Sequence, residues 1–239
     1  MEAEMNNRRN GDETRRIILE VSSRLFAEKG YRDTVHEEIC RLANVNIGAI
    51  NYHFRSKEKL YAEAWRQAFR QSLEKHPVDG GVSPDAPAEE RLRSRILSIM
   101  RRMSDPENIE FEIIHKEMAN PTGLLAEVMR ESLDPLRADI QSIVRELIGK
   151  EASEIEVHLC EMSILGQCFN PLVMQMRHRN SLLPEDKFKS PDFDIETIAT
   201  HVARFSMAGI MEIRSGTGKR RSRKNIQGKK LMFAKEASL

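Results

Sequence analysis

The residues best suited to chemistry lie between Asn46 and Lys57, in a stretch with few apolar side chains. Val45, Ile50 and Phe54 are spaced so that they can hold one side of this stretch against a small core. The remaining side chains are small or hydrogen-bonding: Ile47, Gly48, Ala49, Asn51, Tyr52, His53 and Lys57. Amide, phenol, imidazole and ammonium groups bind the phosphates and base edges of DNA. The stretch therefore predicts a DNA-binding surface.

Other elements must position this stretch, because a helix so short does not persist alone. An amphipathic pattern predicts a first helix over residues 13–29, and Gly30 follows where a helix C-terminus is expected. Thr34 is predicted to cap a second helix. The residues of that helix expected to face inward are Val35, Ile39 and Leu42.

Three polar residues are predicted to frame the short helix. Asn44 suits a left-handed turn after the second helix, and Asn46 is a good N-cap for the short helix itself. Ser56 is predicted to cap a fourth helix, which the apolar periodicity extends to Lys75. Short helices joined by tight turns, the third of them exposing polar residues, make a helix-turn-helix unit.

Beyond residue 76, prolines and glycines mark a break before the pattern becomes helical again. Helices are predicted over residues 91–103, 109–118, 135–149, 153–179 and 194–214. The third of these is expected to start with Asp134 as N-cap and Pro135 as first helical residue, and to end at Gly149. The fold class is therefore all-α.

Apolar stripes mark the last two long helices as packing elements. The helix over 153–179 has alternating +4 and +3 spacing through Ile155, Leu159, Met162, Gly166, Phe169, Val173 and Met176. The final helix has two stripes, one through Ile195, Ile198, Val202, Phe205 and Gly209, the other through Ala199, Ala203, Ser206, Ile210 and Ile213. A helix that is apolar on two sides needs two partners. One partner can be its own domain and the other a second subunit, although a single intramolecular bundle would use the same stripes.

The net charge of +1 conceals an uneven distribution. Residues 1–79 carry a net +1, residues 80–213 carry −8 and residues 214–239 carry +8. The middle of the chain is therefore unsuited to lying on a polyanion. The basic C-terminal segment is predicted to be a disordered tail that either adds non-specific DNA affinity or is simply solvated.

Several classes of protein are disfavoured by what the sequence lacks. No apolar run reaches the ~18 residues of a membrane span, and residues 1–12 do not resemble a secretory signal. The three cysteines lie in apolar helical patterns without CxxC spacing, which favours a reduced cytoplasm. Metal-ligand clusters, glycine-rich phosphate loops and nucleophile elbows are not found in the sequence, so no metal, cofactor or enzymatic activity is predicted.

Taken together, these motifs resemble those of a known family. Residues 26–34, Ile39, residues 45–54 and residues 56–60 are together similar to the N-terminal domain of the TetR (tetracycline-repressor, AcrR-like) family, over about residues 12–62. The wording Gly-Ala-Ile-Asn-Tyr-His-Phe and the later Glu117-x-x-x-Pro121-Thr122 are similar to a subgroup with a CerR-type C-terminal domain. The chain departs from the family at four positions, Val35, Cys40, Asn44 and Asn51. Asn51 is the departure expected to change sequence preference.

The motif predicts these DNA contacts: Thr34, Asn46, Ile47, Gly48, Ala49, Asn51, Tyr52, His53 and Lys57. Lys57 adds a cation to helix-terminal amides that favour phosphate, and Thr34, Tyr52 and His53 can donate to phosphate oxygens. Asn51 can bind adenine through two hydrogen bonds, and Ile47 or Ala49 can contact a thymine methyl. Alternatively, Tyr52 and His53 pack against the first helix, and Ile47 completes the small core.

The resemblance also implies the domain order: a disordered N-terminus over 1–11, the helix-turn-helix domain over 12–60 with its fourth helix continuing to about 76, a helical ligand-binding and dimerisation domain over 77–214, and the tail over 215–239. The predicted dimer contacts are Met162, Gly166, Phe169, Val173, Val202, Phe205 and Gly209. The predicted ligand contacts are His115, Glu161 and Gln167, each of which could equally be a hydrogen-bonded core residue.

These observations predict a cytoplasmic one-component transcriptional regulator. It is expected to be a ligand-responsive repressor that binds a palindromic double-stranded operator as a homodimer, with a small-molecule inducer and no membrane partner. One alternative is a transcriptional activator of the same fold. Another is a helical small-molecule-binding protein or enzyme with a vestigial helix-turn-helix, which would need acids, bases or metal ligands converging after residue 90.

Overall fold

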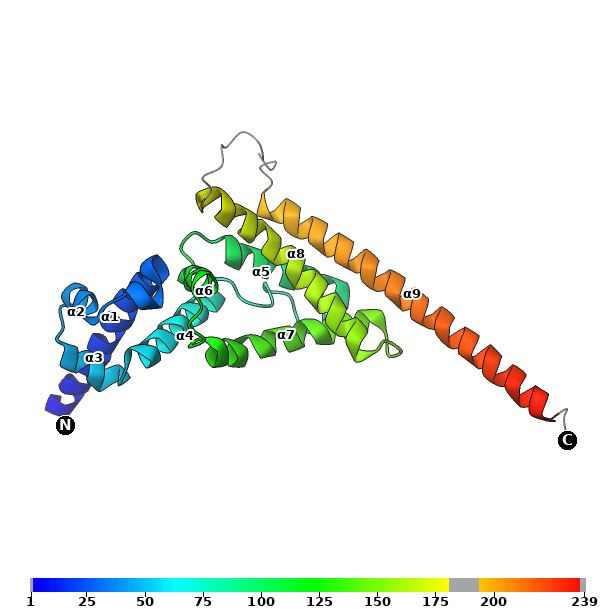
Figure 1. Ribbon diagram of the computed structural model, residues 1–239, viewed down its shortest axis with the longest axis horizontal. Coiled ribbons are helices and arrows are strands. Elements are labelled where there is room, and N and C mark those ends of the chain that lie inside the picture. Colours follow the sequence, from blue (N-terminus) through cyan, green and yellow to red (C-terminus); the bar gives the residue numbers. More distant parts are fainter. Residues whose placement is uncertain (1, 181–193, 237–239) are drawn as a thin grey trace. The chain divides into compact units, whose positions relative to one another are not determined.

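A computed structural model shows that the chain is folded into successive helices (Figure 1). It describes the backbone of residues 2–180 and 194–236, and the side chains of residues 11–169 and 194–216. The described residues form nine helices and no strand, which confirms the all-α prediction. The helices are α1 Glu2–Asp33, α2 His36–Ala43, α3 Ile47–Phe54, α4 Lys57–Lys75, α5 Ala88–Ser104, α6 Ile109–Ala119, α7 Ala126–Ile148, α8 Glu154–Asn180 and α9 Ile195–Glu236. Over those residues, no helix combines the length and apolar character that crossing a bilayer requires.

The chain divides into two compact units. Unit 1 contains Met1–His76 and Arg102–Pro135, and unit 2 contains Pro77–Arg101 and Leu136–Leu239. The limit after residue 76 matches the end predicted for the fourth helix. Residues 102–135 were expected in the second domain, yet they pack with the first, because α6 lies against α1 and α4.

Unit 1 is built around α1, which packs against both α4 and α6. Ile18 and Phe26 of α1 and Trp65 of α4 are fully buried, and Phe111 of α6 is nearly so. Burial of large side chains such as these removes apolar area from water, which is the main favourable contribution to folding. The packing gives the short helices α2 and α3 a rigid support.

Gly30 ends the regular part of α1 as predicted. Its φ of 81° and ψ of 175° lie outside the helical region, although helix is assigned on to Asp33. A Cβ at this position would lie 3.6 Å from Cβ of Lys116 on α6, so the strained backbone and not crowding favours glycine here. At its other end α1 begins at Glu2, so residues 2–11 are helical where a disordered segment was predicted.

A buried polar cluster joins the end of α4 to α5 and α6. Asn108 caps α6 through Oδ1, which accepts from the Glu110 amide at 3.0 Å. Its Nδ2 donates to Ser72 Oγ at 3.0 Å and to the Arg102 carbonyl at 2.8 Å. Arg102 and Glu110 are buried 4.0 Å apart. Burial raises the pKa of Glu110 and lowers that of Arg102, because desolvation disfavours both charges.

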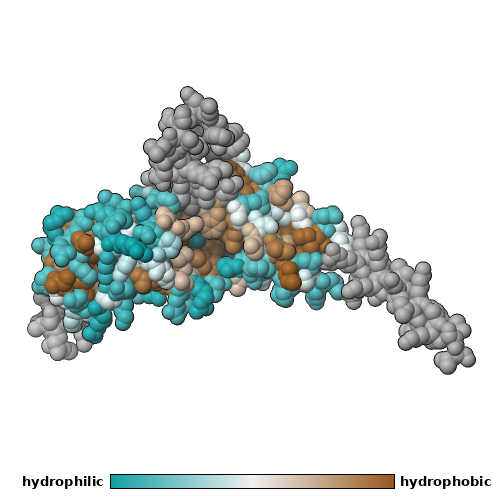
Figure 2. Space-filling model, in the orientation of Figure 1, coloured by the Kyte–Doolittle hydropathy of each residue, from teal (hydrophilic) through white to brown (hydrophobic). Residues whose placement is uncertain are grey.

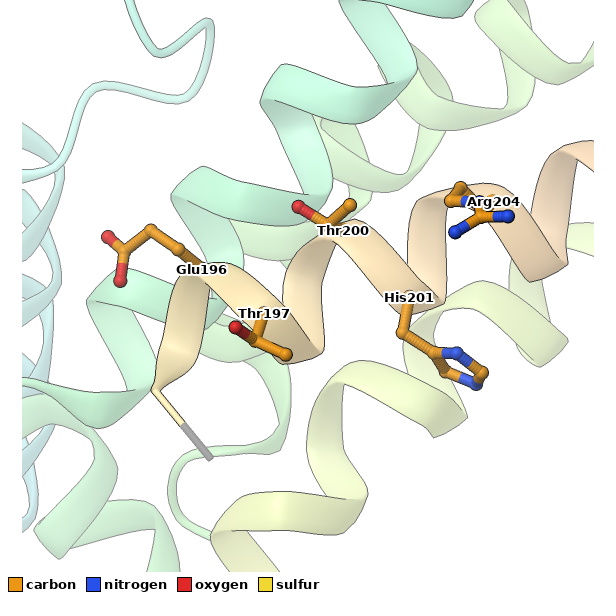
Figure 3. Close-up of a pocket in the computed structure, with 5 residues that line it drawn as sticks. All are labelled: Glu196, Thr197, Thr200, His201 and Arg204. Atoms are coloured by element: carbon orange, nitrogen blue, oxygen red, sulfur yellow. The ribbon is translucent and has the colours of Figure 1, made fainter. Parts of the chain in front are cut away.

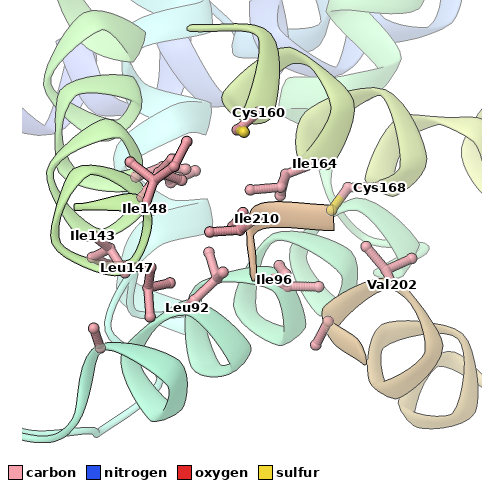
Figure 4. Close-up of a cluster of buried hydrophobic side chains, with 14 of the residues drawn as sticks. Leu92, Ile96, Ile143, Leu147, Ile148, Cys160, Ile164, Cys168, Val202 and Ile210 are labelled. Carbon is pink, nitrogen blue, oxygen red and sulfur yellow. The ribbon is translucent and has the colours of Figure 1, made fainter. Parts of the chain in front are cut away.

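Unit 2 has its own apolar core, to which α5, α7, α8 and α9 all contribute (Figure 4). Leu92 and Ile96 of α5 and Ile143 of α7 are fully buried there. Ile164 of α8 and Ile210 of α9 complete the core from the other helices. The opposite sides of α8 and α9 are therefore available for other contacts.

Two predicted boundaries differ from the structure. Pro135 lies inside α7, which begins at Ala126, so the prediction of a helix start at Asp134-Pro135 was wrong. Leu125 and Val128 are buried at the beginning of α7, and burial of this kind stabilises the turns that precede Pro135. Gly149 ends α7 as expected, with a φ of 93°. In the basic segment, α9 continues to Glu236 where a disordered tail was predicted.

Candidate nucleic-acid interface

The turn between α2 and α3 depends on Asn44. This residue adopts the left-handed conformation, with φ 53° and ψ 48°, and its amide donates to the Cys40 carbonyl at the end of α2. The Val45 amide donates to the same carbonyl at 3.0 Å. Asparagine tolerates this conformation better than most residues. The expectation that Asn44 can replace glycine at this turn is confirmed.

Asn46 caps α3 as predicted. Its Oδ1 accepts a hydrogen bond from the Ala49 amide at 3.0 Å. A Cβ at Gly48 would come within 3.0 Å of this oxygen, so a larger residue there would press on the cap. Gly48 is exposed, and because it has no side chain it adds no bulk to the surface at the beginning of α3.

The outer face of α3 carries most of the predicted contact residues. Ile50 and Phe54 are buried beneath it, while Ile47 is 48% and Tyr52 is 77% exposed. The alternatives in which Ile47 completes the core or Tyr52 packs against α1 are therefore wrong. Asn51 is also exposed. The face thus presents an amide, a phenol and an aliphatic side chain together.

His53 and Ala49 are each half-buried, and so are less accessible than the other predicted contacts on α3. The His53 ring lies edge-on to Tyr52, with ring centroids 5.0 Å apart, and 6.1 Å from the Phe54 ring. His53 is thus held at the border between the small core and the exposed face.

Arg55 shapes the turn from α3 into α4. Its φ of 70° and ψ of −45° are strained for a residue with a side chain. The turn is closed by the Ser56 amide, which donates to the Phe54 carbonyl at 2.8 Å. Ser56 Oγ then accepts from the Lys59 amide at 3.3 Å, which confirms the predicted cap of α4. Arg55 is exposed beside the predicted contacts, and its location there was missed by sequence reasoning.

Lys57 is the first residue of α4 and is half-buried. Its Nζ lies 4.4 Å from the ring centroid of Tyr31, a favourable position for a cation over an aromatic face. Burial lowers the pKa of Lys57, while the charges of Glu58 and Asp33 act in the opposite direction. The contact of Tyr31 with Lys57 was not predicted from the sequence, because no local pattern shows which aromatic ring a lysine far along the chain will contact.

Thr34 does not belong to the exposed set. Its side chain is fully buried, and its hydroxyl donates to the Gly30 carbonyl at 2.8 Å. The N-cap of α2 is Val35, which has no side-chain cap bond. Both predicted roles of Thr34, the cap and the hydroxyl contact to phosphate, are therefore corrected: it fastens the turn after α1. Val35 and Leu42, expected to face inward, are each 48% exposed.

The predicted ligand contacts are not brought together. His115 is half-buried on α6 in unit 1, whereas Glu161 and Gln167 belong to α8 in unit 2. The fully buried Glu161 carboxylate accepts from Arg137 Nε at 2.6 Å and from Gln141 Nε2 at 2.6 Å, which joins α8 to α7. Burial by itself would raise the pKa of Glu161, but these bonds and that from His158 lower it. Gln167 donates to the Ser163 carbonyl within α8.

One surface depression lies along the first turns of α9 (Figure 3). Its described lining comes from this helix alone: Glu196, Thr197, Thr200, His201 and Arg204. Arg101 of α5 forms an ion pair with Glu196 at 2.9 Å, and His201 stacks on Phe205. None of the predicted ligand contacts lines this depression.

The predicted dimer stripe of α8 is exposed in the single chain. Leu159 is 53% and Met162 is 54% exposed, whereas Cys160 and Ile164 of the same helix are buried in the core of unit 2. Figure 2 shows apolar surface where Figure 1 places α8 and α9. The single bundle therefore leaves this stripe uncovered. The other exposed members of the stripe are Ile155, Gly166 and Phe169.

The α9 stripe is only partly exposed. Phe205 is 62% exposed and Gly209 is exposed, but Val202 is 3% exposed and packs in the core of unit 2. The assignment of Val202 to the dimer interface was therefore wrong, because its own bundle already covers it. The side chain of Val173, also predicted there, lies outside the described residues.

Comparison with known proteins places both parts of the chain. Residues 18–64 match the family model described as bacterial regulatory proteins, tetR family. Residues 88–210 match the model described as HTH-type transcriptional dual regulator CecR, C-terminal domain. The second match shows that the C-terminal domain is similar to that of CecR, which corrects the label CerR-type used above.

Individual relatives agree with these matches. The chain is 24% identical over 156 residues to the HTH-type transcriptional regulator SrpR of Pseudomonas putida, covering 65% of this chain and 70% of that protein. It is 28% identical over 169 residues to a probable acrEF/envCD operon repressor of Escherichia coli, covering 67% and 74%. Among solved structures, AibR in complex with isovaleryl coenzyme A and operator DNA shares the fold, with a TM-score of 0.54 and 20% identity, covering 80% and 97%.

Proposed function

Because the chain belongs to the family of regulators with a TetR-type DNA-binding domain and a CecR-type C-terminal domain, we propose that it represses transcription as a ligand-responsive homodimer on a palindromic operator. The observation that carries the proposal is the outer face of α3. A capped helix of eight residues, buried only through Ile50 and Phe54, presents its polar side chains to solvent. Because its proposed partner is operator DNA, the protein is also proposed to act in the cytoplasm.

The side chains divide into two classes of contact. Asn51 and Ile47 are proposed to meet base edges in the major groove, where an amide pairs with adenine and an aliphatic group packs on a thymine methyl. Tyr52, His53 and Lys57 are proposed to bind phosphates, with the amides at the start of α4 as further donors. Asn46, Gly48 and Ala49 bring the beginning of α3 close to the duplex.

A second subunit is proposed because one α3 contacts only a few base pairs. Dimeric helix-turn-helix proteins place two such helices in successive major grooves, about 34–36 Å apart. The uncovered apolar stripe of α8, with Leu159 and Met162, and Phe205 of α9 are proposed to form the subunit interface. An interface on α8 and α9 leaves the α3 helices to contact DNA.

Repression is supported by a relative described as an operon repressor, and regulation by a small molecule is a proposal drawn from the fold. An effector that changes the distance between two α3 helices weakens binding by an amount typical of allosteric coupling, about 1–3 kcal/mol. The matched family is named after a dual regulator, so whether this protein represses or activates transcription needs its own test.

The experiment is a duplex titration with purified full-length protein at physiological salt. Candidate palindromes from the DNA upstream of its own gene are compared with scrambled duplexes of equal length and composition. The proposal expects affinity for one palindrome at least about 10³-fold above that for its scrambled control. Equal affinities for all duplexes would overturn it. A reporter driven from the same DNA then separates repression from activation.

A further inference from the structure

Tyr31 contacts the first two residues of α4, Lys57 and Glu58. It follows Gly30 near the end of α1 and is half-buried. Lys57 Nζ lies 4.4 Å above its ring centroid, and its hydroxyl donates to Glu58 Oε1 at 2.8 Å. One side chain thus holds a cation on its face and a carboxylate at its edge.

The Tyr31 ring is itself fixed from behind. It stacks on Phe26 of α1, with centroids 6.3 Å apart, and lies 5.1 Å from the ring of Tyr61 on α4. Tyr61 donates to Glu117 Oε2 at 3.1 Å. Burial and the bond to Glu58 raise the pKa of Tyr31 to about 12, so its hydroxyl stays a donor at neutral pH.

The neighbouring charges of Lys57 and Glu58 attract each other, and Tyr31 contacts both groups. Hydrogen bonds from Ser56, from the Glu58 amide and from Tyr31 hold the pKa of Glu58 at about 2, so this carboxylate is ionised. Tyr31 binds the carboxylate at the hydroxyl edge of its ring and the ammonium over the face. A lysine ammonium has three donors, so contact with the ring leaves others for a phosphate.

Holding Lys57 in place favours binding for an entropic reason. A free lysine loses rotamer freedom when it is immobilised at an interface, which weakens association. A lysine already held over a fixed ring loses less. We propose that Tyr31 is a positioning residue for DNA binding: it pre-orders Lys57 for a phosphate of the operator backbone. This inference rests on the proposed DNA-binding function.

The test is a double-mutant cycle on the operator duplex selected above, measured as dissociation constants over a range of salt. The variants are Tyr31→Leu, Lys57→Met and the double variant, with Lys59→Met as the matched control. Lys59 is exposed in the same turn of α4. Tyr31→Phe keeps the ring and removes the bond to Glu58.

Lys57→Met should weaken operator binding about 5–10-fold and reduce the salt slope by about one. Tyr31→Leu should weaken binding about 2–5-fold, the size expected of an exposed cation–aromatic contact. In the Lys57→Met background, Tyr31→Leu should have almost no further effect, whereas in the Lys59→Met background its effect should be undiminished. Tyr31→Phe should bind within about twofold of the unaltered protein.

Equal effects of Tyr31→Leu with and without Lys57 would overturn the inference, as would an unchanged affinity of Tyr31→Leu. Unaltered protein that binds operator no better than scrambled DNA would instead refute the proposed function. If Tyr31→Leu fails to fold, fluorinated phenylalanines at position 31 keep the shape of the ring while weakening its negative face. Affinity that falls stepwise with fluorination supports the inference, and affinity independent of fluorination overturns it.

Discussion

The outer faces of α3 and α8 leave opposite kinds of side chain uncovered. Helix α3 buries Ile50 and Phe54 and exposes Asn51 and Tyr52, so its accessible face is rich in hydrogen-bonding groups. Helix α8 buries one apolar stripe and exposes a second, which includes Leu159 and Met162.

This difference indicates different partners for the two helices. A polar face on a rigid short helix suits DNA, because individual phosphates and base edges each need their own hydrogen-bond partner. An exposed apolar stripe at heptad-like spacing suits another helix, because its burial removes apolar area from water. Both faces remain uncovered in the single chain, and the following changes test each assignment separately.

The largest effect is expected from charges on the α8 stripe. The double variant Leu159→Glu, Met162→Glu should raise the dimer dissociation constant more than about 100-fold, because two carboxylates would be desolvated in an apolar interface. Sedimentation velocity over a range of protein concentrations measures this. The control is Ala138→Glu on the exposed surface of α7. A double variant that stays as dimeric as the control would remove α8 from the interface.

A change behind the exposed faces should alter stability and leave both kinds of binding intact. Asp105 accepts from Lys75 Nζ at 2.8 Å and His76 Nε2 at 2.9 Å, and its side chain is 9% exposed. Burial by itself would raise the pKa of Asp105, but these bonds bring it down to about 2. Asp105→Asn should therefore lower the free energy of unfolding at neutral pH by about 1–2 kcal/mol, as measured by urea denaturation.

The pH dependence has a definite sign. Because the folded pKa of Asp105 lies below the ordinary 3.8, its contribution is complete above about pH 4 and is lost as the pH falls toward 2. Asp105→Asn should flatten stability in that window. Glu107→Gln is the control, since Glu107 also pairs with Lys75 but is 82% exposed, and its loss should cost less than about 0.5 kcal/mol. A larger loss for Glu107→Gln than for Asp105→Asn would contradict the assignment.

An effect of similar size, on operator affinity and not on stability, is expected from Asn51 on the face of α3. Asn51→Ala should weaken operator binding by about 1–2 kcal/mol and relax the preference for adenine at one position of each half-site. Unfolding free energy should stay unchanged, because the side chain is exposed. Binding to a library of single-base operator variants measures the preference. Uniform weakening at every position would make Asn51 a phosphate contact.

The smallest effect is expected when the basic C-terminal segment, residues 217–239, is deleted. Deletion of residues 217–239 removes eight of the nine basic residues that follow residue 213. Specific affinity should change by less than about threefold, while the salt slope for random duplexes should become shallower. An unchanged slope would mean that the segment is only solvated.

Local signals were predicted well from the sequence. The caps by Asn46 and Ser56 and the stop at Gly149 each depend on a residue acting on its own neighbours, so the type of residue was sufficient. Thr34 shows the limit, since its hydroxyl could serve a cap, a phosphate or the Gly30 carbonyl, and only the packed chain selects the last. The prediction that Val202 lies in the dimer interface was wrong for a similar reason. An apolar stripe on a helix does not specify whether its own bundle or a second subunit covers it.

The contact between Tyr31 and Lys57 was beyond sequence reasoning for the same reason. The two residues lie on different helices, and their meeting depends on how α1 and α4 pack. The exposed set on α3 was predicted almost completely, because three apolar residues at fixed spacing define which side is buried. The ligand contacts were the weakest prediction, since the structure places His115 in one unit and Glu161 and Gln167 in the other.

The central claim is that two copies of the α3 face bind one palindrome. It is tested most directly by titrating the full-length protein onto an operator duplex at concentrations well above the dissociation constant, with mass determined by sedimentation. We expect two chains per duplex for the full palindrome and at least about 100-fold weaker binding to a duplex with one half-site scrambled. A single chain per duplex, or equal affinity for the whole and the half-scrambled palindrome, would contradict it.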